Sequence, residues 1–274
     1  MTGEREVPLA GGNLSVVVRV GDTVRRPTGP WTPAVHALLR HLEAAGFDGA
    51  PRVHGLDEQG REVLDYVEGT VAWGPAHHRL LGTEDDLARA GDLLRRFHEA
   101  AARFRQPDGT RWRFPEMAAD AARWAGGQGT VVCHNDPAAW NLVVGSARWV
   151  LIDWDTAGPR PPIWDLAYAA RGMVPVTGSD PTALGWEGAI PDTRRLRALV
   201  EGYGLDATDR ARFADVVVAR MESSYEHMRR RALAGEQRWA HLWHTGHGAG
   251  WAIDIAHARR RRAEWRQALR EGRH

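Results

Sequence analysis

The chain of 274 residues is long enough to bury a sizeable core and suits one large domain or two lobes. Its 43% hydrophobic and 26% charged residues are typical of a globular protein, and a net charge of +1 gives no argument for nucleic acid or an anionic membrane as partner. The single cysteine excludes an internal disulfide, and no apolar run reaches the roughly 18 residues of a membrane-spanning helix, so we expect a cytoplasmic protein.

The N-terminal quarter of the chain predicts a small antiparallel sheet with one helix. Short runs rich in β-branched residues alternate with turn-forming residues, for example at 10–13 and 21–22. Pro33 suits the first turn of a helix with Thr32 as its N-cap, and Gly46 is placed to end that helix. The expected strands are 6–9, 14–20, 22–26, 52–55 and 61–68.

The rest of the chain predicts a mostly helical part, and we place the boundary between an N-lobe of residues 1–68 and a C-lobe of residues 69–274. Glycine and proline at 69–78 suit a connector between lobes. From Thr83 onward apolar residues recur at helical spacing, and His98 within this stripe is predicted to be a packed core residue. Helices are expected at 83–104, 114–124, 165–171, 191–203, 207–233 and 237–268, the last with a break at the glycines near 246–250.

The most informative spacing in the chain lies between two apolar β-type runs, within residues 131–155. His134-x-Asp136-x-x-x-x-Asn141 is followed after twelve residues by Asp153. This pattern matches the kinase catalytic-loop template, in which a metal-binding Asp follows the segment His-x-Asp-x-x-x-x-Asn. A hairpin with a plain polar turn has no need of this register, so the spacing predicts a phosphoryl-transfer site.

The chemistry of phosphoryl transfer accounts for each residue type in the motif. An acceptor hydroxyl must be held in line with the γ-phosphate, and an Asp carboxylate can orient it and accept its proton, so Asp136 is the expected catalytic base. Mg²⁺ prefers a few hard oxygen ligands, which Asn141 and Asp153 can supply. His134 is the second candidate catalytic residue, and loop support by hydrogen bonding is favoured for it over proton transfer.

The segments 134–141, 152–155 and 158–167 together resemble the aminoglycoside phosphotransferase family, whose members are small-molecule kinases with a protein-kinase-like fold. The resemblance implies an α+β protein with a small antiparallel-sheet N-lobe and a mostly helical C-lobe. It also implies ATP or GTP as phosphate donor, Mg²⁺ as cofactor, and a small hydroxylated acceptor, an aminoglycoside or another molecule. By the same resemblance, Asp165 anchors the catalytic loop and does not react.

The resemblance also assigns residues to the nucleotide. Gly11 and Gly12 would belong to the loop that covers the phosphates. Main-chain groups near Asp65, Tyr66 and Val67 would bond the purine edge. Two adjacent glycines also suit an ordinary turn, and that alternative stays open.

A strand lysine contacts the phosphates in the family, but all 36 Lys or Arg positions of this chain are arginines. Arg26 is the expected substitute, because it shares a strand face with Val24, and Arg25 is the alternative. The family's partner glutamate on the next helix is also missing, since its position holds Val35 or His36. The ion pair is therefore expected to be absent or rewired.

The acceptor side leaves several alternatives open. A polyamine acceptor would need carboxylates, whereas tryptophans at helical spacing would suit an apolar or sugar-stacking wall. The missing lysine and glutamate also motivate a second function, a catalytically impaired nucleotide-binding pseudokinase with a regulatory role. No charge pattern favours nucleic acid or a membrane, and the oligomeric state is unknown. The candidate carboxylates are Asp155, Glu222, Glu226 and Asp254, and the candidate tryptophans are Trp239, Trp243 and Trp251; each also suits a surface or core role.

Overall fold

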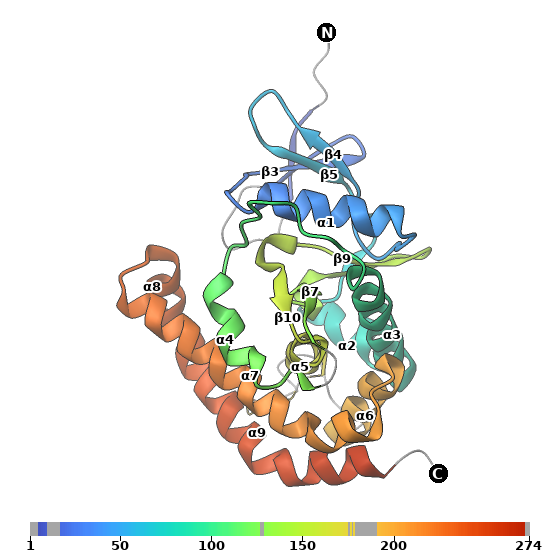
Figure 1. Ribbon diagram of the computed structural model, residues 1–274, viewed down its shortest axis with the longest axis vertical. Helices are drawn as coiled ribbons and strands as arrows, with labels where there is room; N and C mark the ends of the chain where they lie inside the picture. Colours follow the sequence, from blue (N-terminus) through green and yellow to red (C-terminus); the bar gives the residue numbers. More distant parts are fainter. Residues whose placement is uncertain are drawn as a thin grey trace.

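The protein has a small sheet-containing lobe at its N-terminal end and a larger, mostly helical part beside it (Figure 1). The structure is a computed structural model that describes residues 5–9, 17–126, 129–174, 176, 178 and 191–271. The arrangement confirms the α+β architecture expected from the sequence, with an antiparallel sheet preceding the helices.

Five antiparallel strands form the N-terminal sheet in the order β1-β2-β3-β5-β4. The pairing of β3 with β5 places Arg26 directly opposite Glu62 and Thr23 opposite Asp65. Cross-strand neighbours of this kind lie close enough for their side chains to interact. The strands are β1 (Val7–Pro8), β2 (Val18–Val20), β3 (Thr23–Arg26), β4 (Val53–Leu56) and β5 (Glu62–Asp65).

Helix α1 (Thr32–Ala44) lies between this sheet and the helical part (Figure 1). Thr32 is the first residue inside the helix and Trp31 is the N-cap, so the predicted cap is one residue too late. The Thr32 hydroxyl instead accepts a hydrogen bond from the Gly29 N–H (2.9 Å). Gly46, with φ 77°, follows the helix end, as expected of a residue that can adopt a left-handed conformation. The helix buries Val35, Leu38, Leu39 and Leu42.

Helices α3 and α6 form the closest helix packing of the C-terminal part. A Cβ atom at Gly91 of α3 would lie 2.2 Å from the Leu199 carbonyl oxygen, and a Cβ atom at Gly202 of α6 would lie 2.0 Å from the Ala88 carbonyl oxygen. Glycine is required at both positions because any side chain would collide with the opposite backbone. α3 (Glu84–Ala101) begins with the expected capping box of Thr83 and Asp86.

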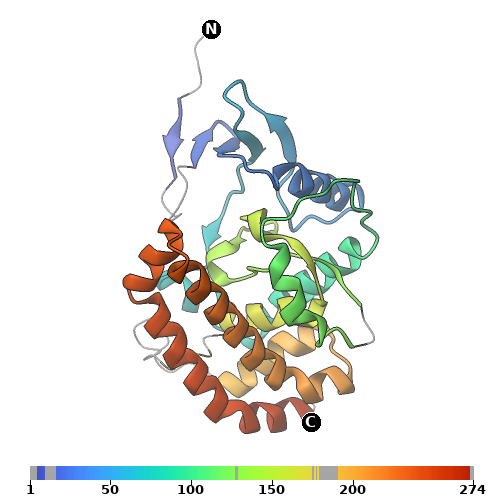
Figure 2. The ribbon, with the colours of Figure 1, turned by 60° about the vertical axis from the view of Figure 1, so that its left-hand side comes forward.

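The remaining helices cover the central part of the molecule, and α7 and α9 run side by side along one edge (Figures 1 and 2). The expected helix at 237–268 is divided at Gly246, which has φ 98°. The segment predicted as a helix at 114–124 is a short 3₁₀ turn, Pro115–Met117, followed by α4. The helices are α2 (Pro75–Leu81), α4 (Ala118–Ala122), α5 (Pro162–Met173), α6 (Asp192–Tyr203), α7 (Ala207–Leu233), α8 (Gln237–His244) and α9 (His247–Arg270).

None of the helices in the described ranges combines the length and the apolar character needed to cross a lipid bilayer. Their buried faces instead join a single hydrophobic cluster, to which α3, α5, α6 and α7 contribute most of the aliphatic side chains. The tryptophans Trp154, Trp164 and Trp265 are among the largest side chains enclosed in it.

Two small sheets carry the predicted motif. β7 (Val131–Cys133) pairs with β10 (Gly158–Arg160), and β8 (Leu142–Val144) lies between β6 (Thr70–Val71) and β9 (Trp149–Leu151). The loop 134–141 connects β7 to β8, and the loop 152–157 connects β9 to β10. Because β8 and β9 are antiparallel partners, the first loop ends and the second begins at the same end of these two strands.

Candidate functional site

The Asp136 side chain lies at the centre of the loop 134–141. Asn141 donates from Nδ2 to Asp136 Oδ2 (2.8 Å) and to the Asp136 carbonyl oxygen (3.0 Å), and Trp140 Nε1 lies 3.4 Å from Oδ2. Asp136 Oδ1 is enclosed and has no hydrogen-bond partner among the described residues. Oδ2 is therefore fixed, while Oδ1 makes no hydrogen bond of ordinary geometry and can accept one from a bound ligand.

Asp136 is also electrostatically unusual. Burial and the nearby Asp153 carboxylate raise the pKa of Asp136 to about 7, while the neighbouring donor groups of Tyr168, Trp140 and Asn141 lower it. A carboxylate whose pKa lies near neutrality is better matched to accepting a proton than an ordinary surface Asp. Tyr168, on α5, was not predicted as a site residue, because no local pattern connects it to a loop some thirty positions earlier.

Asp165 anchors the loop 134–141 through the loop backbone. Its carboxylate accepts hydrogen bonds from the backbone N–H groups of His134 (2.9 Å) and Asn135 (2.7 Å), and from His98 Nε2 (3.0 Å). His98 is fixed in turn by the Tyr203 hydroxyl (2.8 Å from Nδ1). These contacts agree with the expected anchoring role of Asp165 and the expected core position of His98.

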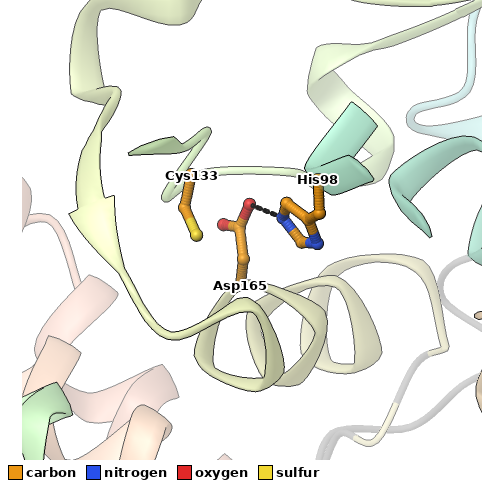
Figure 3. Close-up of side chains that lie close together, drawn as sticks. All are labelled: His98, Cys133 and Asp165. Atoms are coloured by element: carbon orange, nitrogen blue, oxygen red, sulfur yellow. Dashed lines mark hydrogen bonds and ion pairs between the residues drawn. The ribbon is translucent and has the colours of Figure 1, made fainter. Parts of the chain in front are cut away.

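Figure 3 shows His98, Cys133 and Asp165 converging in the interior, with ligand-type atoms all within 4.8 Å of one another. Hydrogen bonds already account for these atoms: Cys133 Sγ donates to the Arg160 carbonyl oxygen (3.3 Å), and the Asp165 oxygens accept from the catalytic loop and from His98. Burial raises the pKa of the Cys133 thiol, which disfavours the thiolate that a metal would need. The cluster is thus a structural support.

His134 is fully buried, and both of its ring nitrogens make contacts within the chain. Nδ1 accepts a hydrogen bond from the Asp136 N–H (3.3 Å), so Nε2 carries the proton and donates to the Ile152 carbonyl oxygen (3.0 Å). Burial lowers the pKa of His134, which favours this neutral form. The ring thereby joins the loop 134–141 to the loop after β9.

Asn135, the second residue of the loop, carries a strained backbone with φ 67°. Its Nδ2 donates to the carbonyl oxygens of Thr156 (2.9 Å) and Gly158 (3.2 Å), and its own carbonyl accepts from Arg220 Nη2 (3.0 Å). Arg220 comes from α7, is only 2% exposed, and lies 4.5 Å from the Tyr168 ring centroid. Such over-determination by several elements is what keeps a non-glycine residue in this conformation.

Asp153 meets the N-terminal sheet through Arg26. Arg26 Nη2 lies 2.8 Å from Asp153 Oδ1 and 3.4 Å from Asp155 Oδ1, and Arg26 Nη1 lies 3.5 Å from Glu62 Oε1. Burial lowers the pKa of Arg26, but these three carboxylates outweigh it, so the net pKa is raised. Arg25 points elsewhere and lies 3.7 Å from Asp57, so Arg26 is the arginine that faces the candidate site.

The ion pair that was expected to be absent or rewired is formed by Arg26 with a carboxylate from another element, Glu62 of β5. Glu62, 2% exposed, receives Arg26 on one oxygen and His36 Nε2 (3.1 Å) on the other. The carboxylate thus comes from β5, and its partner on α1 is His36, one of the two residues predicted to stand in place of the family's glutamate. The register that places Glu62 opposite Arg26 explains the substitution, because strand pairing brings the two together without help from the helix.

Of the residues predicted to contact the nucleotide, the structure describes Asp65, Tyr66 and Val67. Gly11 and Gly12 lie outside the described residues. The N–H of Asp65 already donates to the Arg52 carbonyl oxygen (3.1 Å), and that of Tyr66 to the Asp22 carbonyl oxygen (2.8 Å).

Sheet contacts therefore occupy these two donors, which leaves carbonyl oxygens and the backbone of Val67 for a purine edge. The side chains of the segment also have partners in the sheet. His54 Nε2 bonds the Asp65 carboxylate (2.8 Å), and the Arg19 guanidinium lies 3.6 Å from the Tyr66 ring centroid.

The carboxylates considered for a polyamine acceptor have arginine partners. Glu222 pairs with Arg259 (2.7 Å), Glu226 with Arg229 (2.8 Å), Asp254 with Arg171 (3.3 Å), and Asp155 with Arg113 (3.0 Å) and Arg26. The three tryptophans do not share one set of partners either: Trp239 contacts Phe114 and His227, Trp243 contacts Tyr225, and Trp251 contacts Tyr168. Of the predicted acceptor residues, Asp155 alone shares an arginine partner, Arg26, with Asp153.

Comparison with known proteins places this geometry in context. A family model described as the phosphotransferase enzyme family matches residues 106–214, which include the catalytic loop. The trifolitoxin immunity protein of Rhizobium leguminosarum bv. trifolii is 35% identical over 263 residues, covering 90% of this chain and 95% of that protein.

Solved structures agree on the fold. A choline/ethanolamine kinase family protein from Mesorhizobium loti superposes with a TM-score of 0.61 at 19% identity, covering 98% of this chain and 93% of the other. The amicoumacin kinase hAmiN, solved in complex with AMP-PNP, Ca²⁺ and Ami, gives a TM-score of 0.58 at 12% identity, covering 97% of this chain and 87% of the other. At these identities the likeness concerns the arrangement of the chain and leaves the acceptor undefined.

Proposed function

The chain belongs to the phosphotransferase enzyme family, and on that basis we propose that it transfers the γ-phosphate of ATP or GTP to a hydroxyl group of a small molecule. The observation that carries the proposal is the state of Asp136. One of its oxygens is fixed by Asn141, the other is enclosed and unpartnered, and its pKa is raised to about 7. An acceptor hydroxyl is the donor that would complete this arrangement, with Asp136 as its base.

Asn141 and Asp153 are the proposed Mg²⁺ ligands. The Asn141 amide donates both of its resolved bonds from Nδ2 to Asp136, which leaves its Oδ1 as the cation-facing atom. The Asp153 side chain is half exposed and stands beside Arg26. Two hard oxygen ligands with room for water suit Mg²⁺, which when bound would spread the charge that develops on the phosphate oxygens.

Arg26 is the proposed phosphate-binding cation in place of the missing lysine. Its guanidinium stands next to Asp153 and is held from behind by Glu62. A guanidinium can bind phosphate oxygens in a bidentate manner, although its planar fork does not copy the position of an ammonium group. His134 would act by holding the loop, since both ring nitrogens are engaged within the chain.

The proposed division into an N-lobe of residues 1–68 and a C-lobe of residues 69–274 fits the strand pairing. Residues up to β5 join the five-stranded sheet, whereas β6 pairs with β8 of the catalytic hairpin. Gly69, with φ 151°, separates the two, and a Cβ there would lie 2.6 Å from the Val144 carbonyl oxygen. The backbone of residues 65–67 then connects the lobes, where the purine edge is proposed to bind.

The names of the related proteins suggest acceptor classes to test first. One is an immunity protein against the toxin trifolitoxin, one is a kinase of the antibiotic amicoumacin, and one belongs to the choline/ethanolamine kinase family. We propose an acceptor from the antibiotic or toxin class ahead of choline, because the relative with the higher sequence identity is the immunity protein. Inactivation by phosphorylation would then protect the cell that makes this protein.

The test is a transfer assay with purified protein, Mg²⁺, and ATP or GTP, against a panel of hydroxylated antibiotics, peptides and amino alcohols. Asp136→Asn should lower turnover by roughly 10²–10⁴-fold with the fold intact, because the isosteric amide cannot accept the proton. Asp85→Asn, which changes an exposed carboxylate on α3, is the matched control.

Two results would reject the assignment. Near-normal turnover of Asp136→Asn would remove Asp136 from the role of base. Tight Mg²⁺-nucleotide binding without transfer to any acceptor would favour the pseudokinase alternative, whose motivation is the arginine and histidine found where the family has lysine and glutamate.

A further inference from the structure

Arg238, the second residue of α8, is a cation near the candidate catalytic carboxylates that has no ion-pair partner in the described part of the chain. Its Nε is buried and lacks a hydrogen-bond partner there. The Nε atoms of Arg171 and Arg220 are in the same state, but the guanidinium groups of these two arginines have other partners. A guanidinium that lacks a carboxylate is a ready site for an anion.

The packing of α8 explains how Arg238 comes to this place. The neighbouring Trp239 ring contacts the Phe114 ring (6.1 Å between centroids, near perpendicular). Phe114 directly follows Arg113, whose Nη1 donates to Asp155 Oδ2 (3.0 Å). Figures 1 and 2 show α8 at the end of the helical part that is nearest the N-terminal lobe. α8 therefore approaches the catalytic carboxylates through the segment 113–114.

The charges around Arg238 agree with this position. Burial lowers the pKa of its guanidinium and so does Arg113, whereas the carboxylates of Asp153, Asp136 and Asp155 raise it. The three carboxylates thus act on Arg238 across a distance too long for ion pairs. An anion that enters between them and Arg238 would meet an unneutralised positive group.

The other charges on these helices do not compensate Arg238. On α7, Glu222 is paired with Arg259 and Glu226 with Arg229. A polycationic ligand would find few free carboxylates on this side, whereas an anionic group would find Arg238. The sequence alone favours a polycationic ligand, because it offers several acidic residues in the same helices.

We propose that Arg238 binds an oxyanion beside Asp136, either the γ-phosphoryl group of the nucleotide or an acidic group on the acceptor. The proposal deepens the phosphotransferase function and rests on it. Both sources share the same chemistry, a charge-assisted hydrogen bond from a guanidinium to a phosphate or carboxylate oxygen.

Inorganic phosphate serves as the probe, and its binding is measured by isothermal titration. Wild type, Arg238→Gln and Arg238→Lys are titrated in two states: saturated with the Mg²⁺ diphosphate nucleotide, where the γ position is open, and saturated with Mg²⁺ AMP-PNP or its guanine counterpart, where it is filled. The matched control is Arg230→Gln, an exposed arginine of α7 that pairs with Glu226.

Loss of charge-assisted hydrogen bonds should weaken phosphate binding by about tenfold or more in Arg238→Gln, and less in Arg238→Lys. Weakening only in the diphosphate state identifies the γ-phosphoryl group as the anion. Weakening in both states identifies an acidic group on the acceptor.

Two results overturn the proposal: equal phosphate affinity of wild type and Arg238→Gln in both states, or no phosphate binding by wild type. Absence of nucleotide binding is a separate result that rejects the phosphotransferase function. In that case phosphate is titrated into the three proteins without nucleotide, and equal affinity of wild type and Arg238→Gln there overturns the proposal as well.

Discussion

The loop 134–141, which holds the proposed base, and the Arg26 side chain are positioned by different means. The loop 134–141 is held from within the C-terminal part by Asp165, which accepts two of its backbone N–H groups, and by Arg220, which donates to one of its carbonyls. Arg26 is held by side chains alone, between Glu62 on one side and Asp153 on the other.

The difference shows which part of such a site can change its residues. Backbone hydrogen bonds fix the path of the loop and demand particular residue types, since a carboxylate must accept two N–H groups at once. Side-chain ion pairs demand only charge of the right sign within reach. The carboxylate that supports the cation can then come from a strand instead of a helix, as Glu62 does here.

The pH dependence of turnover probes Asp136 in the loop 134–141. We expect it to change turnover more than any of the variants described below. Burial and Asp153 raise the pKa of Asp136 to about 7, so Asp136 is protonated below that pH and cannot accept the hydroxyl proton. Turnover should fall by about tenfold per pH unit below 7 and level off above it.

A rate–pH profile at saturating nucleotide measures this. A flat profile between pH 5 and 8, in a protein that stays folded, would show that no group with this pKa controls the reaction.

Asp165→Asn tests the backbone support directly. An amide offers one acceptor oxygen in place of two, so at least one loop N–H loses its partner in a fully buried site. We expect destabilisation by about 2–4 kcal/mol and roughly 10–100-fold slower turnover. Thermal unfolding and transfer assays measure both, and unchanged values in both would mean that the loop holds its shape without Asp165.

Arg26→Gln tests the site that is held by side chains alone. A smaller effect on stability than that of Asp165→Asn would sharpen the difference between side-chain and backbone support. We expect roughly tenfold weaker Mg²⁺-nucleotide binding, because the charge that faces the phosphates is lost. Arg26→Lys should recover part of the affinity, since a single ammonium keeps the charge but cannot contact Asp153 and Glu62 together. Equal affinity of wild type and Arg26→Gln would exclude Arg26 from phosphate binding.

His36→Glu has the smallest expected effect and tests the rewiring itself. The change places a second carboxylate beside Glu62, where His36 Nε2 now lies 3.1 Å from Glu62 Oε2. Like-charge repulsion in a buried site should cost about 1–2 kcal/mol of stability. Adding Glu62→Gln should restore most of this stability, because residues 36 and 62 then include a single carboxylate. A double-mutant cycle by chemical denaturation measures the coupling. Additive effects would show that residues 36 and 62 act independently.

The sequence predicts the parts of this molecule that depend on local order. The spacing of Asp136, Asn141 and Asp153 is sufficient to place them on two adjoining loops, since it reflects one hairpin. Helices α6 and α7 begin and end within about one residue of their predicted bounds, because their apolar stripes and their N-terminal residues agree.

The sequence does not predict contacts that depend on register or on distant elements. Glu62 meets Arg26 through the pairing of β3 with β5, and a shift of that register by one residue would turn it to the other face. Tyr168 and Arg220 reach the loop from α5 and α7, and their positions depend on how these helices pack. The surroundings of Arg238 likewise depend on the helix interruption at Gly246, between α8 and α9, and on the contact of α8 with Phe114.

The guanidinium beside Asp153 determines how this site can be labelled. Reagents that acylate the amine of a phosphate-binding lysine have no side-chain target here, since the chain contains no lysine. Dicarbonyl compounds that condense with arginine would be the appropriate reagents, and nucleotide should protect Arg26 from them. The positive charge at Arg26 also cannot be removed by proton loss at any physiological pH, because the neighbouring acids raise its pKa further. Alkaline inactivation of this protein would therefore have to begin at another group.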